Sequence, residues 1–174
     1  MQWWAGMLFL YLFLGNTFLH AQTYPVQATL QIAPPYSVFL SDYVAPGSEQ
    51  MRLNLLLQDL TEPSYDVRLR LVIEGQGIRI ETDPSFNPPP LTLESGMPSW
   101  LGATELGAYF NPQNLIFSGY SRSEFERFGR LPEGFYRFCF TAYDYRRPDV
   151  QLSQQSCTNL WLVRPDPPML NLPA

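Results

Sequence analysis

Hydrophobic and polar residues alternate with a period of two through much of this chain, and this pattern constrains the fold more than any other feature. The alternation begins at residues 26–32 and returns at 51–58 and 65–74. After the segment 75–77, which has a glycine at each end, it continues at 78–81. Such alternation is typical of antiparallel strands with one buried and one solvated face, and the glycines suit a tight turn. The sequence therefore predicts a sheet with a hairpin at 75–77.

The centre of the chain departs from this alternation. The segment "DPSFNPPP" at 83–90 contains four prolines, which remove backbone donors and fix φ, so we expect a loop or a sheet edge there. Residues 101–110 and 121–131 have helix-like spacing. Ser121 stands three residues before Glu124, as in a capping box. The sequence therefore predicts one or two short helices in this region.

Strands return near the end of the chain, at 135–145 and 157–163. About seven short strands, with few residues left for helix, favour a mainly β fold. We predict an immunoglobulin/fibronectin-like antiparallel β-sandwich with one or two short helices in a long crossover, covering residues 22–165. A β-barrel remains an alternative, because strand number alone does not separate the two architectures.

The two ends of the chain differ in composition from this domain. Residues 3–14 form an uncharged apolar run, and the small residue Ala21 follows, so residues 1–21 are predicted to be a secretory signal peptide. An uncleaved membrane anchor is the alternative, although a spanning helix needs roughly twenty apolar residues. Residues 166–174 are predicted to be a proline-rich linker. We therefore expect a secreted or cell-envelope protein, in the periplasm or on the outer surface, with no integral membrane span after cleavage.

The chain contains two cysteines, Cys139 and Cys157, and the alternation places both on the outer faces of neighbouring strands. This position suits a disulfide between them. Reactive or metal-bound thiols are the alternative. However, the chain has no lysine and its single histidine, His20, lies in the predicted signal peptide, so few groups remain to activate a thiolate or complete a zinc site. We predict a structural disulfide, and no catalytic residue, metal or cofactor.

The charge of the chain and the placement of its carboxylates indicate whether it could bind nucleic acid or act as a hydrolase. The net charge is −5 and the eleven arginines are scattered, so we predict no nucleic-acid partner. Near pairs of acids such as Asp59 with Glu62 leave a hydrolase as an alternative, but nothing in the pattern selects one pair. The sequence predicts a protein that is not an enzyme.

Aromatic and arginine side chains supply the candidate contact residues. One group lies in the irregular region 100–125, where the rings either form a platform for a carbohydrate or a partner, or pack as a small secondary core. A second group surrounds a proline-containing turn, where the arginines either pair with Asp144 and Asp149 or present an exposed anchor. The candidates are Trp100, Tyr109, Phe110 and Tyr120 in the first group and Tyr143, Tyr145, Arg146 and Arg147 in the second.

The start of the strand at 135–145 contains a further pattern. Gly134 stands two residues before Tyr136, which is similar to the tyrosine corner of immunoglobulin-like sandwiches. Phe138 occupies the position where those domains keep a buried cysteine. We therefore do not expect the inter-sheet disulfide of antibody domains.

Taken together and in order, several segments resemble the TANFOR domain family of Bacteroidetes. The most specific are "EPSYDVRLRLVIEGQGIRIET" at 62–82 and "GRLPEGFYRFCFTAYDYRRPDVQLS" at 129–153, followed by "WLVRPDPPMLNLP". The resemblance implies the N-terminal domain of a large secreted protein, with Cys139 and Cys157 recurring in the family. It also implies fibronectin type III-like modules after the proline-rich end, and no assigned enzymatic activity.

These observations lead to one expected function and one alternative. We expect a non-enzymatic exported module with an interaction or structural role, which contacts a protein partner or the following domains of the same polypeptide. The alternative is a carbohydrate-binding module that uses the aromatic residues of the 100–125 region, with a glycan as its ligand.

Overall fold

The computed structural model describes residues 24–164, so the predicted signal peptide (1–21) and the predicted linker (166–174) lie outside the described residues. Nine strands form the framework of this range. They are β1 (Val26–Ile32), β2 (Met51–Leu57), β3 (Ser64–Gly75), β4 (Ile78–Thr82), β5 (Leu91–Glu94), β6 (Pro98–Leu101), β7 (Leu115–Ser118), β8 (Gly134–Asp144) and β9 (Ser156–Leu162). The helices are α2 (Ala103–Leu106) and α3 (Arg122–Phe128), with short 3-10 helices η1 (Leu40–Val44), η2 (Gly107–Phe110) and η3 (Pro112–Asn114).

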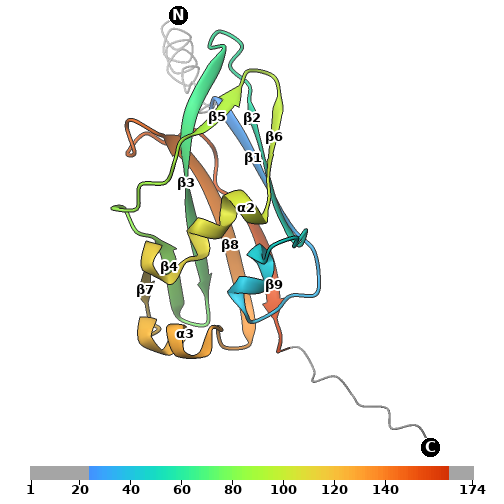
Figure 1. Cartoon of the computed structure of the whole chain (residues 1–174), viewed down its shortest axis with the longest axis vertical. Helices are drawn as coiled ribbons and strands as arrows, with labels where there is room; N and C mark the ends of the chain where they lie inside the picture. The colour runs from blue at the N-terminus through green and yellow to red at the C-terminus, as the bar shows by residue number, and fades with distance from the viewer. Residues whose placement is uncertain (1–23, 165–174) are drawn as a thin grey trace, which may run out of the picture.

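The strands form two antiparallel sheets that pack face to face (Figure 1). The smaller sheet has the order β1-β2-β6, and the larger has the order β7-β4-β3-β8-β9, with β5 also paired to β3. Every pairing between named strands is antiparallel. The predicted mainly β, antiparallel sandwich with two short α-helices is confirmed.

The strand order is that of an immunoglobulin-like sandwich. In that fold, strands A, B and E share one sheet, and strands C, F and G share the other. Here β1, β2 and β6 take the places of A, B and E, while β3, β8 and β9 take those of C, F and G. β4 lies beside β3, where variable-type domains add a further strand to the C-F-G sheet.

The alternation seen in the sequence explains the core between the sheets. On β8 the side chains of Tyr136, Phe138, Phe140 and Ala142 all point inward and are fully buried. β3 lies beside β8 in the same sheet and extends this buried face, because the register pairs Leu71 with Phe140. The largest fully buried side chains are Tyr43, Tyr136, Phe138, Phe140, Leu40, Met51, Leu53, Leu55, Leu57, Leu69, Leu71 and Ile73.

The predicted hairpin at 75–77 is confirmed. Gly75 pairs with Ile78, which leaves a two-residue loop of Gln76 and Gly77 between β3 and β4. Both loop residues have positive φ, 52° for Gln76 and 72° for Gly77. Two positive φ values define the type I′ turn, whose twist matches that of the flanking strands.

The crossover between β6 and β7 contains α2, η2 and η3, and α3 follows between β7 and β8. Leu106 of α2, with Tyr109 and Phe110 of η2, is buried in the core.

The capping box predicted at Ser121 is wrong. Ser121 is the N-cap residue of α3, but its hydroxyl lies 2.7 Å from the Ser123 hydroxyl and makes no capping bond to the helix backbone.

The first and last strands run in the same direction along one side of the sandwich. Val26 and Ser153 form a parallel bridge at one end, and Ser37 and Val163 form another at the far end. Between them, the Ser156 hydroxyl accepts a hydrogen bond of 2.8 Å from the amide of Leu30. The described chain therefore enters at one end of the sandwich and leaves at the other (Figure 1). Among residues 24–164, no helix is long and apolar enough to cross a bilayer.

The tyrosine-corner interpretation of Tyr136 does not match the structure. The Tyr136 hydroxyl is buried without a hydrogen-bond partner among the described residues, and burial raises its pKa to about 12. The bond that defines the motif, from the hydroxyl to an upstream backbone carbonyl, is instead made by Tyr43, which donates to the Ser37 carbonyl at 2.8 Å.

This difference predicts opposite results for two substitutions that each remove one hydroxyl. Tyr136→Phe removes a buried group that gains nothing from folding, so the free energy of unfolding is expected to stay unchanged or rise by up to about 1 kcal/mol. Tyr43→Phe leaves the Ser37 carbonyl unpaired and is expected to cost about 1 to 2 kcal/mol. Urea denaturation of both variants measures the difference, and a larger loss in Tyr136→Phe than in Tyr43→Phe would contradict it.

Candidate functional site

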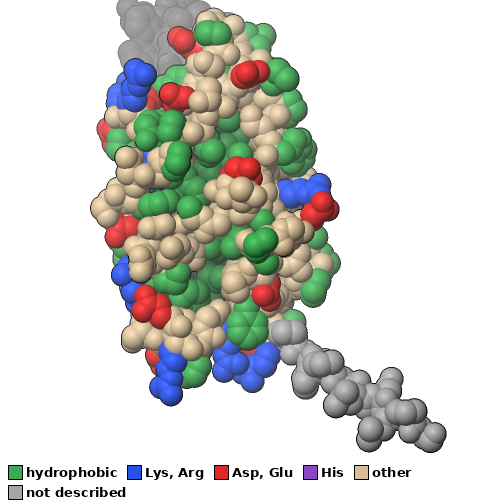
Figure 2. Space-filling model, in the orientation of Figure 1, with side chains coloured by type: hydrophobic (Ala, Val, Ile, Leu, Met, Phe, Trp, Pro, Cys, Tyr) green, Lys and Arg blue, Asp and Glu red, His purple; other side chains and the backbone are tan. Residues whose placement is uncertain are grey.

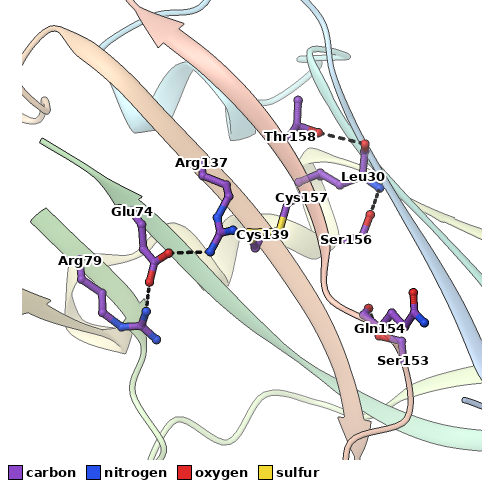
Figure 3. The surroundings of a disulfide bond; sticks show 10 residues. All are labelled: Leu30, Glu74, Arg79, Arg137, Cys139, Ser153, Gln154, Ser156, Cys157 and Thr158. Atoms are coloured by element: carbon purple, nitrogen blue, oxygen red, sulfur yellow. Dashed lines mark hydrogen bonds and ion pairs between the residues drawn. A yellow bond between two sulfur atoms is a disulfide. The ribbon is translucent and has the colours of Figure 1, made fainter. Parts of the chain in front are cut away.

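The two cysteines form the predicted disulfide. Cys139 on β8 lies directly opposite Cys157 on β9, with an S–S distance of 2.12 Å and Cα atoms 4.1 Å apart. Both lie on the outer face of the larger sheet, as predicted, with the Cys139 side chain fully buried and Cys157 exposed (Figure 3). Among residues 24–164 there is no free cysteine.

Charged side chains flank this disulfide on the same face. Glu74 pairs with Arg137 at 2.8 Å and also with Arg79 (Figure 3). Arg79 in turn pairs with Glu81 at 2.7 Å. These side chains are between about one third and one half exposed, so their pairing contributes little to stability. This face therefore joins the strands with a covalent link and a ladder of surface ion pairs.

A cavity of about 510 Å³ opens where β3 begins and β8 ends. Strand pairing creates it, because Val67 of β3 lies opposite Asp144 of β8 and the Tyr65 ring reaches the same place. The turn after β8 adds two arginines. The lining residues are Glu62, Ser64, Tyr65, Asp66, Asp144, Arg146 and Arg147.

Asp144 is the central residue of this cavity, and its side chain is only 6% exposed. One carboxylate oxygen accepts from the Tyr65 hydroxyl at 2.8 Å and from Nε and Nη2 of Arg147 at 3.0 and 2.8 Å. The other accepts from the backbone amides of Arg146 and Arg147, at 2.8 and 2.9 Å. Burial alone would raise the pKa of Asp144, but these hydrogen bonds outweigh it and hold the pKa at about 2.

The groups that surround Asp144 titrate far from neutral pH. The hydrogen bond to Asp144 raises the pKa of the Tyr65 hydroxyl and also that of the Arg147 guanidinium. General acid–base catalysis near neutrality needs a group whose pKa lies close to the working pH. The amides of Arg146 and Arg147 bind Asp144 and so fix the start of the turn after β8, and Arg146, Glu62 and Asp66 line the same cavity.

The second predicted group of contact residues partly converges on this cavity. Arg147 pairs with Asp144 at 2.8 Å, which matches the interpretation that the arginines of this turn pair with its acids. Arg146 is exposed beside it, and the Tyr145 amide donates to the Asp66 carbonyl. Tyr143 points to the outer face of the sheet, where the Arg70 guanidinium lies 4.1 Å from its ring centre.

The first predicted group is not brought together. Tyr109 and Phe110 are buried in the core, where the Leu69 amide donates to the Tyr109 hydroxyl at 3.3 Å. Half-buried Tyr120 donates to the Arg130 carbonyl at 3.2 Å. Trp100 is 55% exposed on the outer face of the smaller sheet. The predicted ring platform therefore reduces to one exposed tryptophan.

The sequence reasoning missed Tyr65, Glu62 and Asp66 as cavity residues. The only local signal was the spacing of Asp144 and Arg147, three residues apart. Tyr65 lies 79 residues from Asp144 in the chain, and only the register of β3 against β8 brings them together.

Asp144 gives a prediction about acid stability. Its pKa in the folded protein, about 2, lies below the ordinary value of 3.8, so its contribution is present above pH 3.8 and disappears as the pH falls toward 2. The shift corresponds to about 2 kcal/mol. Asp144→Asn is therefore expected to lower the free energy of unfolding by about this amount at pH 7, and by much less near pH 2.

Urea denaturation at several pH values measures this effect. Asp149→Asn is the matched control, because Asp149 is an exposed acid of the same turn and is expected to change stability little at any pH. An Asp144→Asn variant whose deficit is as large at pH 2 as at pH 7 would contradict the assignment.

The described residues thus define a disulfide-linked, immunoglobulin-like β-sandwich with a polar cavity at one end. Within residues 24–164, no three His, Cys, Asp or Glu side chains are grouped so that they could hold a metal ion. Comparisons with protein-family models, curated proteins and solved structures find no match for the chain.

Proposed function

We propose that this chain is a non-enzymatic exported module with an interaction or structural role in a bacterial secreted or cell-envelope protein. The observation that carries the proposal is the parallel course of β1 and β9, which brings the chain in at one end and out at the other. This arrangement suits a domain linked end to end with others. The Cys139–Cys157 disulfide supports export, because such bonds persist mainly in oxidising compartments.

The resemblance to the TANFOR family extends this proposal. The segment 129–153, one of the two most specific for the resemblance, forms β8 and the turn that closes over Asp144. We therefore propose that the domain stands at the N-terminal end of a secreted Bacteroidetes protein and that fibronectin type III-like modules follow it. The partners are then those following domains or a separate protein.

Two measurements test export and interaction separately. Cell fractionation with N-terminal mass spectrometry is expected to find the chain outside the cytoplasm and cleaved after Ala21. An uncleaved cytoplasmic chain would contradict export. For interaction, tagged chain is cross-linked in envelope extracts, and the retained protein is expected to be lost in Arg146→Ala but kept in Arg52→Ala, which alters an arginine paired with Glu49. No specific retention would contradict the interaction role.

A carbohydrate-binding role is a second candidate that one observation favours. Trp100 is exposed on the outer face of the smaller sheet, directly opposite Asn54, whose buried Oδ1 has no hydrogen-bond partner among the described residues. An exposed ring beside an amide acceptor is a combination that suits a sugar. Glycan-array binding that Trp100→Ala abolishes would support it, with Trp161→Ala as the matched control because Trp161 is 61% exposed on the other sheet. Absence of binding to every glycan would exclude it.

A further inference from the structure

The two ends of the sandwich carry different exposed features. At the end where β1 begins, the loop at 58–63 joins β2 to β3, and we call it the tip. At the other end, α3 and the segment that follows it border a second cavity, of about 230 Å³, and we call this cavity the socket. Figure 1 shows the β2–β3 loop at the top of the molecule and α3 at the bottom.

The tip presents a leucine between two acids. Leu60 is 78% exposed and lies between Asp59 and Glu62 in the chain. The conformation is held locally, because the Asp59 carboxylate accepts from both the amide and the hydroxyl of Thr61, at 2.9 and 2.6 Å. The Ser95 hydroxyl also donates to the Asp59 carbonyl at 2.9 Å. The leucine is therefore held outward on a turn that is already formed.

The socket has an apolar floor and an exposed ring at its mouth. The floor comes from Val38, Tyr120 and Leu131, and the Leu131 amide donates to the Val38 carbonyl at 3.0 Å, which ties the two segments together. Phe128, the last residue of α3, is 47% exposed at the cavity edge. The cavity therefore offers apolar surface that an apolar side chain from outside could cover.

Arginines surround this ring. The guanidinium carbons of Arg127 and Arg130 lie 5.2 and 5.8 Å from the centre of the Phe128 ring. Among the described residues, neither arginine forms an ion pair with a carboxylate, unlike Arg52, Arg79, Arg137 and Arg147 elsewhere on the domain. Figure 2 shows arginine side chains gathered at the end of the molecule where α3 lies.

The socket also contains two acids. Glu133 accepts from the Arg164 amide at 2.8 Å, and Glu124 lines the wall. Neither acid forms an ion pair with Arg127 or Arg130 among the described residues, so the guanidinium donors of these arginines remain available to carboxylates from outside.

From this complementarity we propose that the tip of one copy of the chain docks into the socket of a second copy. Leu60 covers the apolar floor beside Phe128. Glu62 and the second carboxylate oxygen of Asp59, which accepts no bond from Thr61, meet Arg127 and Arg130. Arginine is well suited to such contacts because its planar donors match a carboxylate in two places. The inference rests on the proposed structural role and names a partner for it.

The position of the two surfaces determines the type of assembly. Tip and socket lie at opposite ends of one molecule, so the contact joins different surfaces and leaves a free tip and a free socket on every pair. A contact of this kind that does not close into a ring extends into a linear chain. The surfaces are small, and interfaces below ~1,000 Å² are weak, so association is expected only at concentrations approaching about 1 mM.

Sedimentation velocity of the purified exported chain tests the proposal across a concentration series. The unchanged protein is expected to form dimers and longer species as concentration rises. Leu60→Asp in the tip and Arg130→Glu in the socket are each expected to reduce the association constant about tenfold or more. Trp100→Ala, on the exposed outer face of the smaller sheet and outside both the tip and the socket lining, is expected to associate as the unchanged protein does. Circular dichroism and thermal melting verify that each variant is folded.

A mixture of the two deficient variants gives the sharpest result. The Leu60→Asp copy keeps a working socket and the Arg130→Glu copy keeps a working tip, so one contact can form and the mixture is expected to yield dimers but nothing larger. A mixture that stays monomeric would overturn the head-to-tail contact, as would an unchanged protein that remains monomeric at 1 mM. Neither result would affect the cross-linking test of binding to envelope proteins. Failure of self-association and failure of the proposed interaction role can therefore be distinguished.

Discussion

Replacing Phe138 with alanine is expected to lower the free energy of unfolding by about 4 kcal/mol. The Phe138 side chain is fully buried on β8, and its ring centre lies 5.7 Å from that of Tyr43. Truncating a buried phenylalanine removes its hydrophobic contacts and leaves a cavity that its neighbours fill only in part, which costs about 3 to 5 kcal/mol. A domain of this size has a total stability of about 5 to 15 kcal/mol, so the variant is close to unfolding.

The same strand offers a matched control. Phe135 has the same chemistry and stands three residues away, but it points to the outer face and is 50% exposed. Phe135→Ala is therefore expected to cost less than about 1 kcal/mol. Urea denaturation of the two variants gives the difference directly. Equal losses in both would show that β8 is not buried on one face only, and would contradict the sandwich.

The fold of the long strands could be predicted because the signal is local. On β8, alternation alone places Tyr136, Phe138 and Phe140 on one face and Arg137 on the other, and the structure buries the first face and exposes Arg137. A period of two needs no knowledge of the partner strand, since successive side chains of any strand point to opposite faces. The position of Cys157 on the outer face followed from the same rule.

The short strands could not be predicted in this way. β5 and β6 have only four residues each, too few for an alternation to stand out, and β6 begins with Pro98. β7 pairs with β4, from which it is separated by more than thirty residues that include both other short strands. Which strand such a segment joins depends on tertiary packing rather than on its own sequence.

The polar contacts were hardest to predict because they depend on register and on competing local bonds. The Asp144 cluster needs Tyr65 from a distant strand. At Ser121 the sequence pattern was present, but the hydroxyl pairs with Ser123 instead of capping the helix. Tyr136 matched a motif whose hydrogen bond Tyr43 makes in its place. A local sequence pattern identifies a polar side chain, but the surrounding structure determines which group it forms a hydrogen bond with.

Removing the disulfide is expected to lower the free energy of unfolding by about 3 kcal/mol. Cys139 and Cys157 are 18 residues apart in the chain, and a cross-link that closes a loop of this length restricts the unfolded chain by about that amount. The variant Cys139→Ala/Cys157→Ser suits the two environments, since Cys139 is fully buried and Cys157 is exposed. Because β8 and β9 also pair through their backbones along seven residues, the variant is expected to stay folded.

The slope of a urea titration identifies the origin of this loss. If the cross-link acts through the unfolded state, its removal lets the unfolded chain expand and expose more surface, so the dependence of unfolding free energy on urea becomes steeper as stability falls. The unchanged protein under a reductant is expected to reproduce the behaviour of the double variant. A variant that keeps its full stability would show that backbone pairing alone holds β8 to β9. A loss of about 3 kcal/mol with an unchanged slope would instead place the effect in the folded state, where the disulfide lies near Arg137 and Glu74 (Figure 3).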